Sequence, residues 1–94
     1  MATTNTNNSG SRAQSPFAKL VAAELVDART KHGPQASIHE GYAVLLEELD
    51  EVWDEVKKKT KERDMENLLK ELVQVASSAQ KMAEDVVIPK LNKK

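Results

Sequence analysis

Two long stretches of apolar residues at helical spacing, joined by a short polar segment, constrain the fold of this chain more than any other feature. Within each stretch the apolar residues recur every three or four positions, so at about 100° per residue they fall on one face of an α-helix. These positions are Tyr42, Leu45, Leu46, Leu49, Val52, Trp53 and Val56 in the first stretch, and Met65, Leu68, Leu69, Leu72, Val75, Ala76, Ala79, Met82, Ala83 and Val86 in the second. The spacing predicts two antiparallel helices with a turn at about residues 59–63.

Capping residues mark the ends of both predicted helices. Ser37 and Glu40 stand three residues apart, as in a capping box. In that motif the hydroxyl of Ser37 accepts from the N–H of Glu40, and the carboxylate of Glu40 reaches back to the N–H of Ser37. Asp64 is placed to cap the second helix, and Pro89 is expected to end it.

A shorter helix is expected before this hairpin. Ser15 followed by Pro16 is typical of an N-cap and a first helical residue. The helix should end near Lys31, because the pair Gly33-Pro34 breaks it. The fold that we predict is therefore all-α, with a short N-terminal helix and a long antiparallel helical hairpin.

The composition predicts that such a domain self-associates. Of the 94 residues, 39% are hydrophobic, 3% are aromatic and 31% are charged, which suits amphipathic helices with exposed faces better than a thick monomeric core. We expect residues 1–14 to be a disordered polar tail, residues 15–89 to form a single domain and residues 90–94 to be a basic tail. Hairpins of two or more copies should pair into a helical bundle, as a homo-oligomeric dimer or tetramer.

Charge and residue usage exclude several classes of function. The net charge is −1 and the chain has no cysteine, which excludes thiolate nucleophiles, disulfides and Cys-ligated zinc. The basic run over residues 57–63 is short and has no aromatic residues beside it, so nucleic acid is not an expected partner. No apolar run is long enough to cross a bilayer and no signal peptide is apparent, so we expect no membrane partner and a cytoplasmic location.

Acidic residues form a stripe on the predicted helices, turned away from the apolar positions. Glu47 and Glu48 each lie about one turn from Glu51, where stacked like charges weaken a helix. A divalent cation would turn this repulsion into attraction, because Mg²⁺ prefers hard oxygen ligands. The second helix carries a matching polar stripe with Glu71 and Gln74, which an antiparallel hairpin would bring level with the first. A solvated acidic face without a ligand is the alternative interpretation.

The sequence around these acids resembles the MazG-type all-α nucleoside triphosphate pyrophosphohydrolases, whose motif is EExxE followed after a spacer by ExxD. Here residues 47–51 read EELDE and residues 71–74 read ELVQ, with 19 residues between the two halves. The resemblance covers about residues 37–87. It implies a bundle of two or more subunits in which the acids hold Mg²⁺ on a triphosphate, while water attacks to release pyrophosphate and a nucleoside monophosphate.

Carried over by position, the resemblance implies catalytic roles for Glu47, Glu48, Glu51 and Glu71, with Glu48, Glu51 and Glu71 as ligands of Mg²⁺. The departure from the family is Gln74, which stands where the motif has Asp. An amide oxygen can ligate a cation, but it brings no charge and is a poor base. We expect this change to weaken Mg²⁺ binding and hydrolysis.

Five residues are candidates for contact with the nucleotide ligand: Gln74, Ser78, His39, Tyr42 and Lys57. For the last three the alternatives are a surface histidine, a buried anchor and a charge that complements the C-terminus of the helix. Trp53 is expected to pack in a core or in an interface.

Two functions stay open at the level of the sequence. One is a Mg²⁺-dependent nucleoside triphosphate pyrophosphohydrolase weakened by Gln74. The other is a non-catalytic sponge that sequesters a linear or cyclic nucleotide, because small phage proteins that soak up cyclic nucleotide immune signals are similar in size and helical build. An interaction module without a ligand is a third alternative.

Overall fold

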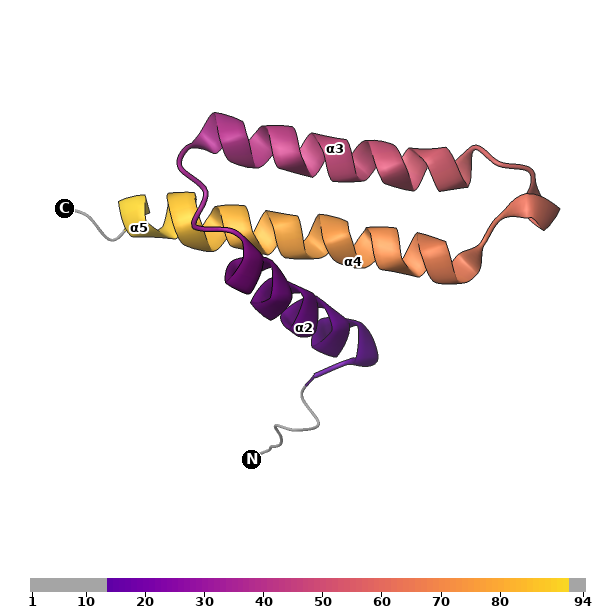
Figure 1. The fold of residues 1–94 in the computed structure, drawn as a ribbon, viewed down its shortest axis with the longest axis horizontal. Helices are drawn as coiled ribbons and strands as arrows, with labels where there is room; N and C mark the ends of the chain where they lie inside the picture. Colours follow the sequence, from indigo (N-terminus) through magenta and orange to yellow (C-terminus); the bar gives the residue numbers. More distant parts are fainter. Residues whose placement is uncertain (1–13, 92–94) are drawn as a thin grey trace, which may run out of the picture.

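The computed structural model describes residues 14–91, and all regular structure in this range is helical (Figure 1). Most of it lies in α2 (Pro16–Lys31), α3 (Ile38–Val56) and α4 (Met65–Met82). A 3₁₀ turn, η1 (Thr60–Glu62), connects α3 to α4, and α4 continues through a π-helical turn, η2 (Ala83–Val87), into α5 (Ile88–Leu91). The predicted all-α class is confirmed for this part of the chain.

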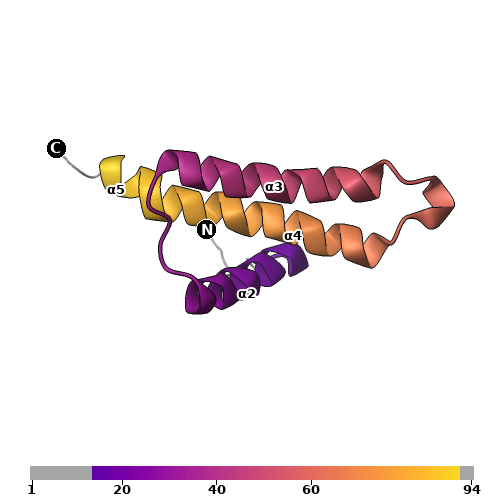
Figure 2. The same ribbon diagram turned by 45° about the horizontal axis from the view of Figure 1, so that its top comes forward.

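The three main helices form a hairpin with a third helix laid against it. α3 and α4 run antiparallel and lie side by side, while α2 crosses against α4 (Figures 1 and 2). Of the two tails that we predicted, residues 1–13 and 92–94 lie outside the described range. Within residues 14–91, every helix is too short or too polar to cross a membrane.

The predicted caps begin all three main helices. The side chains of Ser15, Ser37 and Asp64 each accept a hydrogen bond from the backbone N–H three residues on, at 3.0, 3.0 and 3.1 Å. One half of the expected capping box differs, because the carboxylate of Glu40 accepts from the N–H of Ala36 and not from that of Ser37. The chain before α3 is therefore tied down one residue earlier than predicted.

Pro89 does not end the second helix of the hairpin, contrary to the prediction. In a regular α-helix the proline ring clashes with the carbonyl four residues back. Here the helix has already widened at η2, where the N–H of Ile88 bonds the carbonyl of Ala83, five residues back. The helix therefore accommodates Pro89 and continues to Leu91, so that the first two residues of the predicted basic tail belong to α5.

The contact surface between α3 and α4, which we call the seam, does not contain the largest apolar side chains. Acidic residues lie in the seam instead, which corrects the expectation that the acids lie on the opposite side of the helices. Three contacts trace the seam along the hairpin: Gly41 with Met82, Glu48 with Glu71, and Glu55 with Asn67. The large apolar residues of α3 that are exposed instead, by 37 to 59%, are Ile38, Tyr42, Leu46, Leu49, Trp53 and Val56. The apolar face of α3 is wider than the strip that one neighbouring helix covers, so one edge packs and the other stays in solvent.

Gly41 allows the two helices to approach closely at the open end of the hairpin. A Cβ atom at this position would lie 2.6 Å from Cγ of Met82. At the other end the turn is closed by Glu55, which is only 1% exposed. Its carboxylate accepts hydrogen bonds from the N–H of Asp64 at 2.7 Å, from Nδ2 of Asn67 at 2.8 Å and from Nζ of Lys58 at 3.0 Å. These donors lower the pKa of Glu55 to about 2.

α2 is held against α4 by a small apolar core and by ion pairs. The buried apolar residues of the described range are Val21, Leu25, Val73 and Val86. At the end of α2, Arg29 donates from Nη1 to Asp85 at 2.7 Å and from Nη2 to Glu84 at 2.8 Å. The second oxygen of Asp85 accepts from the backbone N–H of Gln35 at 3.0 Å, so this carboxylate also positions the segment between α2 and α3.

Candidate functional site

Three carboxylates from the two helices of the hairpin meet at its centre. Glu48 and Glu51 on α3 and Glu71 on α4 each place one carboxylate oxygen within 4.8 Å of the others. Glu48 and Glu71 are half-buried in the seam, and Glu51 is exposed at its edge. The helical spacing explains this grouping, because Glu48 and Glu51 are nearly one turn apart and Glu71 lies opposite them on the antiparallel helix.

The electrostatics of this cluster are unfavourable without a counter-ion. Burial raises the pKa of Glu48 above its ordinary value of 4.5, and the negative charges of Glu51 and Glu71 raise it further. Burial also raises the pKa of Glu71, as does a hydrogen bond with the carboxyl group of Glu51. Repulsion of this kind is what a bound cation or a shared proton relieves.

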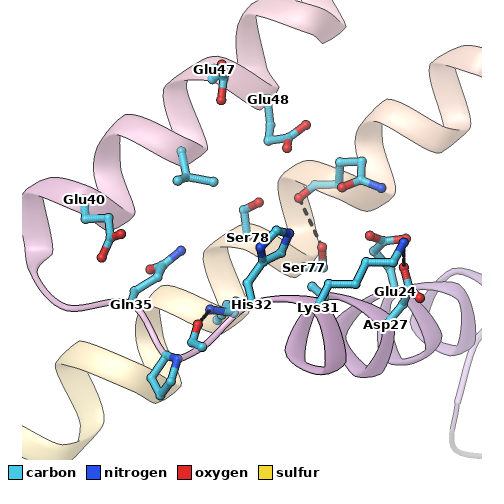
Figure 3. Close-up of a pocket in the computed structure, with 16 residues that line it drawn as sticks. Glu24, Asp27, Lys31, His32, Gln35, Glu40, Glu47, Glu48, Ser77 and Ser78 are labelled. Atoms are coloured by element: carbon cyan, nitrogen blue, oxygen red, sulfur yellow. Dashed lines mark hydrogen bonds and ion pairs between the residues drawn. The ribbon is translucent and has the colours of Figure 1, made fainter.

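A cavity of about 480 Å³ lies beside the cluster, between α2, α3 and α4 (Figure 3). Glu48 belongs to both features, since it lines the cavity and contributes to the cluster. On α4 the wall of the cavity is made by Ser77 and Ser78, which are buried. Their short side chains leave the space between α3 and α2 unfilled.

The cavity is acidic. Its carboxylates are those of Glu24, Asp27, Glu40, Glu47 and Glu48. They outnumber the two lysines of the lining, Lys31 and Lys81. Lys31 is paired with Asp27 at 3.1 Å, and Nζ of Lys81 donates to the carbonyl of Gly33 at 2.8 Å and to Asp85 at 3.3 Å. An anionic ligand would therefore meet net negative charge unless a cation accompanied it.

The predicted site residues fall into two groups. Glu47, Gln74 and Ser78 line the cavity together with Glu48, and Glu51 and Glu71 complete the acidic cluster at its edge. The residues that do not line it are His39, Tyr42 and Lys57. Tyr42 is 59% exposed on the opposite side of α3, and Lys57 pairs with Asp54 at 3.0 Å beyond the seam.

The residues that the sequence-based prediction missed come from α2 and the segment after it. Glu24 lines the cavity, and its charge contributes to the raised pKa of Glu48. The position of Glu24 in the sequence could have indicated this role, because Glu24 lies between Val21 and Leu25 on the side of α2 that packs against α4. Gln35 lies at the far end of the cavity beside Glu40 (Figure 3), and its Oε1 is buried without a hydrogen-bond partner among the described residues.

The acidic cluster suits a hard divalent cation in its chemistry. Three carboxylates offer the oxygen donors that Mg²⁺ and Ca²⁺ prefer, and their separation is near the roughly 3 to 5 Å between ligand oxygens around such ions. Asp54 lies close enough to add to the raised pKa of Glu71, so further negative charge is available nearby. Asp85, in contrast, is engaged by Arg29, Gln35 and Lys81 away from the cluster.

Comparison of the chain with protein-family models, with curated proteins and with solved structures finds no match.

Proposed function

We propose that this protein binds a nucleotide in the cavity between α2, α3 and α4, through a Mg²⁺ ion held by Glu48, Glu51 and Glu71. The observation that carries the proposal is the junction of the two features at Glu48. Three carboxylate oxygens from two helices lie within 4.8 Å of one another at the edge of a cavity of about 480 Å³. A cation there would place the phosphates at the edge and leave the cavity for the nucleoside.

The charge of the site supports a cation-dependent ligand. A triphosphate alone would be repelled by the acidic lining, whereas Mg²⁺ neutralises phosphate oxygens and lowers the pKa of bound water. Burial, and after it the neighbouring carboxyl groups, raise the pKa of Glu48 and of Glu71, and a bound cation would offset both effects. A bound cation would also account for the several like charges that stand one turn apart in a helix that they destabilise.

The chemistry that fits is hydrolysis of a nucleoside triphosphate to a monophosphate and pyrophosphate. Glu47 lines the cavity without joining the cluster, so we assign its carboxylate the role of accepting a proton from the attacking water. Glu48, Glu51 and Glu71 would hold the Mg²⁺, and Ser78 would contact the ligand from the wall of α4. This is the function that the resemblance to MazG-type enzymes implies.

A second candidate function, a sponge that holds a nucleotide without cleaving it, is favoured by Gln74. This residue lies one turn from Glu71 and lines the cavity, at the position where the related motif has an acid. A neutral amide there leaves the site with one fewer carboxylate for Mg²⁺. Ligand binding could then persist after hydrolysis is lost.

Mg²⁺ titration followed by incubation with a panel of nucleoside triphosphates tests the proposal. We expect Mg²⁺ to bind the wild-type protein, Glu51→Gln to abolish that binding, and Glu62→Gln to leave it unchanged, because Glu62 is an exposed acid in the turn. Pyrophosphate release supports the enzyme. Nucleotide recovered intact after denaturation of the complex supports the sponge.

Restoring the acid separates the two functions further. Gln74→Asp should raise Mg²⁺ affinity and any pyrophosphate release, because it adds a carboxylate beside Glu71. If wild-type protein binds neither Mg²⁺ nor nucleotide, and the variant changes neither, the site assignment is wrong.

A further inference from the structure

The cavity lies between α2 and α3, two helices that do not pack against each other. α3 belongs to the hairpin and carries Glu48 of the acidic cluster. The facing wall is the end of α2 with the segment after it, from which Lys31, His32 and Gln35 line the cavity. No Cα atom of α2 lies within 8 Å of one in α3, whereas α2 does pack against α4 (Figures 1 and 2). The width of the cavity therefore depends on how the end of α2 is fastened.

The end of α2 has no apolar anchor. Val21 and Leu25 are the buried residues of this helix, and both lie before its last turn, which ends at Lys31. Val26, the next apolar residue after Leu25, is 64% exposed. Segments with few buried apolar contacts open at a lower free energy than the core does. Polar contacts must therefore hold this wall of the cavity in place.

A single carboxylate, that of Asp85, joins most of these polar contacts. Its Oδ1 accepts from Nη1 of Arg29 on α2 at 2.7 Å, and its Oδ2 accepts from the N–H of Gln35 at 3.0 Å and from Nζ of Lys81 at 3.3 Å. Lys81 in turn donates to the carbonyl of Gly33 at 2.8 Å. The side chain of Asp85 is 7% exposed, so these partners and not water compensate its charge. Loss of that charge would loosen the end of α2 and the segment after it together.

Asp85 lies in the π-helical turn η2, at the end of the cavity where α2 passes into the segment before α3. A π-helical turn has more residues than an α-helical one, so it changes the direction in which its side chains point, and such turns are frequent at functional sites. The change of helix type therefore coincides with the residue that fastens the wall.

We propose that Asp85 is a positioning residue for nucleotide binding, which latches the end of α2 and residues 32–35 as a movable wall of the cavity. With the latch closed, the wall stands opposite α3 and encloses the nucleoside. With the latch released, the wall swings away from α3 and the ligand enters or leaves, as at the lids of many enzymes. This inference rests on the proposed function, because the cavity is where that function places the nucleoside.

The acidic cluster does not depend on the latch. Its helices are held together within the hairpin, where Gly41 packs on Met82 at one end and Glu55 closes the turn at the other. The charge of α2 that acts on Glu48 is that of Glu24, so opening should change Mg²⁺ affinity by no more than about fivefold. Nucleotide affinity, in contrast, should fall in proportion to the fraction of molecules whose cavity is closed.

Binding measurements on latch variants test the proposal. Calorimetry would use Mg²⁺ alone, and then the α,β-methylene analogues of ATP, GTP, CTP and UTP at saturating Mg²⁺. Asp85→Asn should weaken the binding of the preferred analogue at least about tenfold while Mg²⁺ affinity stays within about fivefold of wild type. Glu84→Gln is the matched control, because it removes only the exposed partner of Arg29 and should cost less than about threefold. Equal losses of the two affinities in Asp85→Asn would mean that Asp85 acts only through stability, and would overturn the proposal.

Arg29→Gln provides a second test if Asp85→Asn does not fold. The side chain of Arg29 is 35% exposed, and its removal leaves Asp85 paired with Lys81. We expect this variant to weaken the binding of the preferred analogue more than about threefold, because it releases the end of α2 alone. Wild-type affinity for the analogue in this variant would overturn the latch.

Spin labels measure the movement of the wall without any ligand. The chain has no cysteine, so labels on Val26→Cys of α2 and Ala43→Cys of α3, both exposed, report the distance within one chain when labelled protein is diluted with unlabelled protein. Asp85→Asn should lengthen and broaden that distance, and Mg²⁺ with the preferred analogue should shorten and narrow it again. An unchanged distance overturns the latch even if the wild-type protein binds nucleotide. A wild-type protein that binds none of the analogues overturns the proposed function, and the role of Asp85 in ligand binding with it.

Discussion

A carboxylate oxygen of Glu71 on α4 lies within 4.8 Å of one of Glu51 on α3, across the seam of the hairpin. Two carboxyl groups this close repel each other when both are ionised, so a proton shared between them or a bound cation is favoured. With Glu48 beside them, these carboxyl groups can bind either protons or a cation, so protons and the cation compete for the same oxygens.

Mg²⁺ affinity should fall as the pH is lowered from neutral towards 4.5, the ordinary pKa of a glutamate. The pKa values of Glu48 and Glu71 are raised above 4.5 in the metal-free protein, so protons compete with the cation at a higher pH than they would at an isolated carboxylate. The loss should reach up to about tenfold per pH unit for each proton displaced. Titration calorimetry in buffers of different ionisation enthalpy measures both the affinity and the proton release. Affinity independent of pH over this range would place the bound ion away from these two residues.

Glu24→Gln should weaken Mg²⁺ binding and lower the pKa of Glu48. The charge of Glu24 contributes to the raised pKa of Glu48 from the opposite wall of the cavity, so removing it relieves repulsion and also reduces attraction for a cation. At this range the effect should be about 1 kcal/mol, or roughly fivefold in affinity. NMR titration of the Glu48 carboxyl and calorimetry provide the two readouts. Glu62→Gln serves as the control, because Glu62 is an exposed acid in the turn, outside the cavity.

Stability should fall steeply in acid because of Glu55. Its pKa is lowered to about 2 in the folded protein by the N–H of Asp64, by Asn67 and by Lys58, against an ordinary value of 4.5. A lowered folded-state pKa stabilises the protein above pH 4.5, and this contribution is lost as the pH falls from about 4.5 towards 2. Glu55→Gln should lower the melting temperature at pH 7 and flatten its dependence on pH in this window. An unchanged slope between pH 4.5 and pH 2 would mean that Glu55 does not control the acid transition.

Asp85→Asn should destabilise the protein more than Glu84→Gln does. Both carboxylates bind Arg29, but the side chain of Asp85 is 7% exposed and that of Glu84 is 42% exposed. Asp85 also accepts from the N–H of Gln35 and pairs with the buried Lys81, whose charge would be left uncompensated. We expect a loss of about 2 kcal/mol for Asp85→Asn and less than about 1 kcal/mol for Glu84→Gln. Urea unfolding of the two variants measures the difference, and equal losses would contradict the assigned roles.

Local features of the fold could be predicted because they depend on neighbouring residues. Ser15, Ser37 and Asp64 cap their helices as expected, since a cap needs only a side-chain oxygen and the N–H groups of the next turn. Pro89 shows the limit of such rules. Its effect depends on the π-helical turn before it, which the pattern of apolar residues does not reveal.

Only part of the candidate site could be predicted from the sequence. Spacing predicted that the acids of α3 and Glu71 lie level across an antiparallel hairpin, and the resemblance to MazG-type proteins implied Glu48, Glu51 and Glu71 as a set of ligands; their carboxylate oxygens lie within 4.8 Å of one another. Glu24 was missed, since it comes from α2 and the packing of that helix on α4 is a long-range contact. His39, Tyr42 and Lys57 do not line the cavity. Tyr42 is exposed on the side of α3 turned away from it, and Lys57 follows the end of the helix.

The amino-acid sequence by itself determined where the helices of this protein begin and that the hairpin is antiparallel, because capping, turn length and periodicity act within a few residues. The tertiary structure alone decided which edge of the broad apolar face packs inside the chain. As a result Glu48 and Glu55 lie in the seam, while Leu49 and Trp53 remain exposed to solvent. The physical reason is that a helix can turn by one residue about its axis without any change in its local hydrogen bonds, so only contacts with other helices select its orientation.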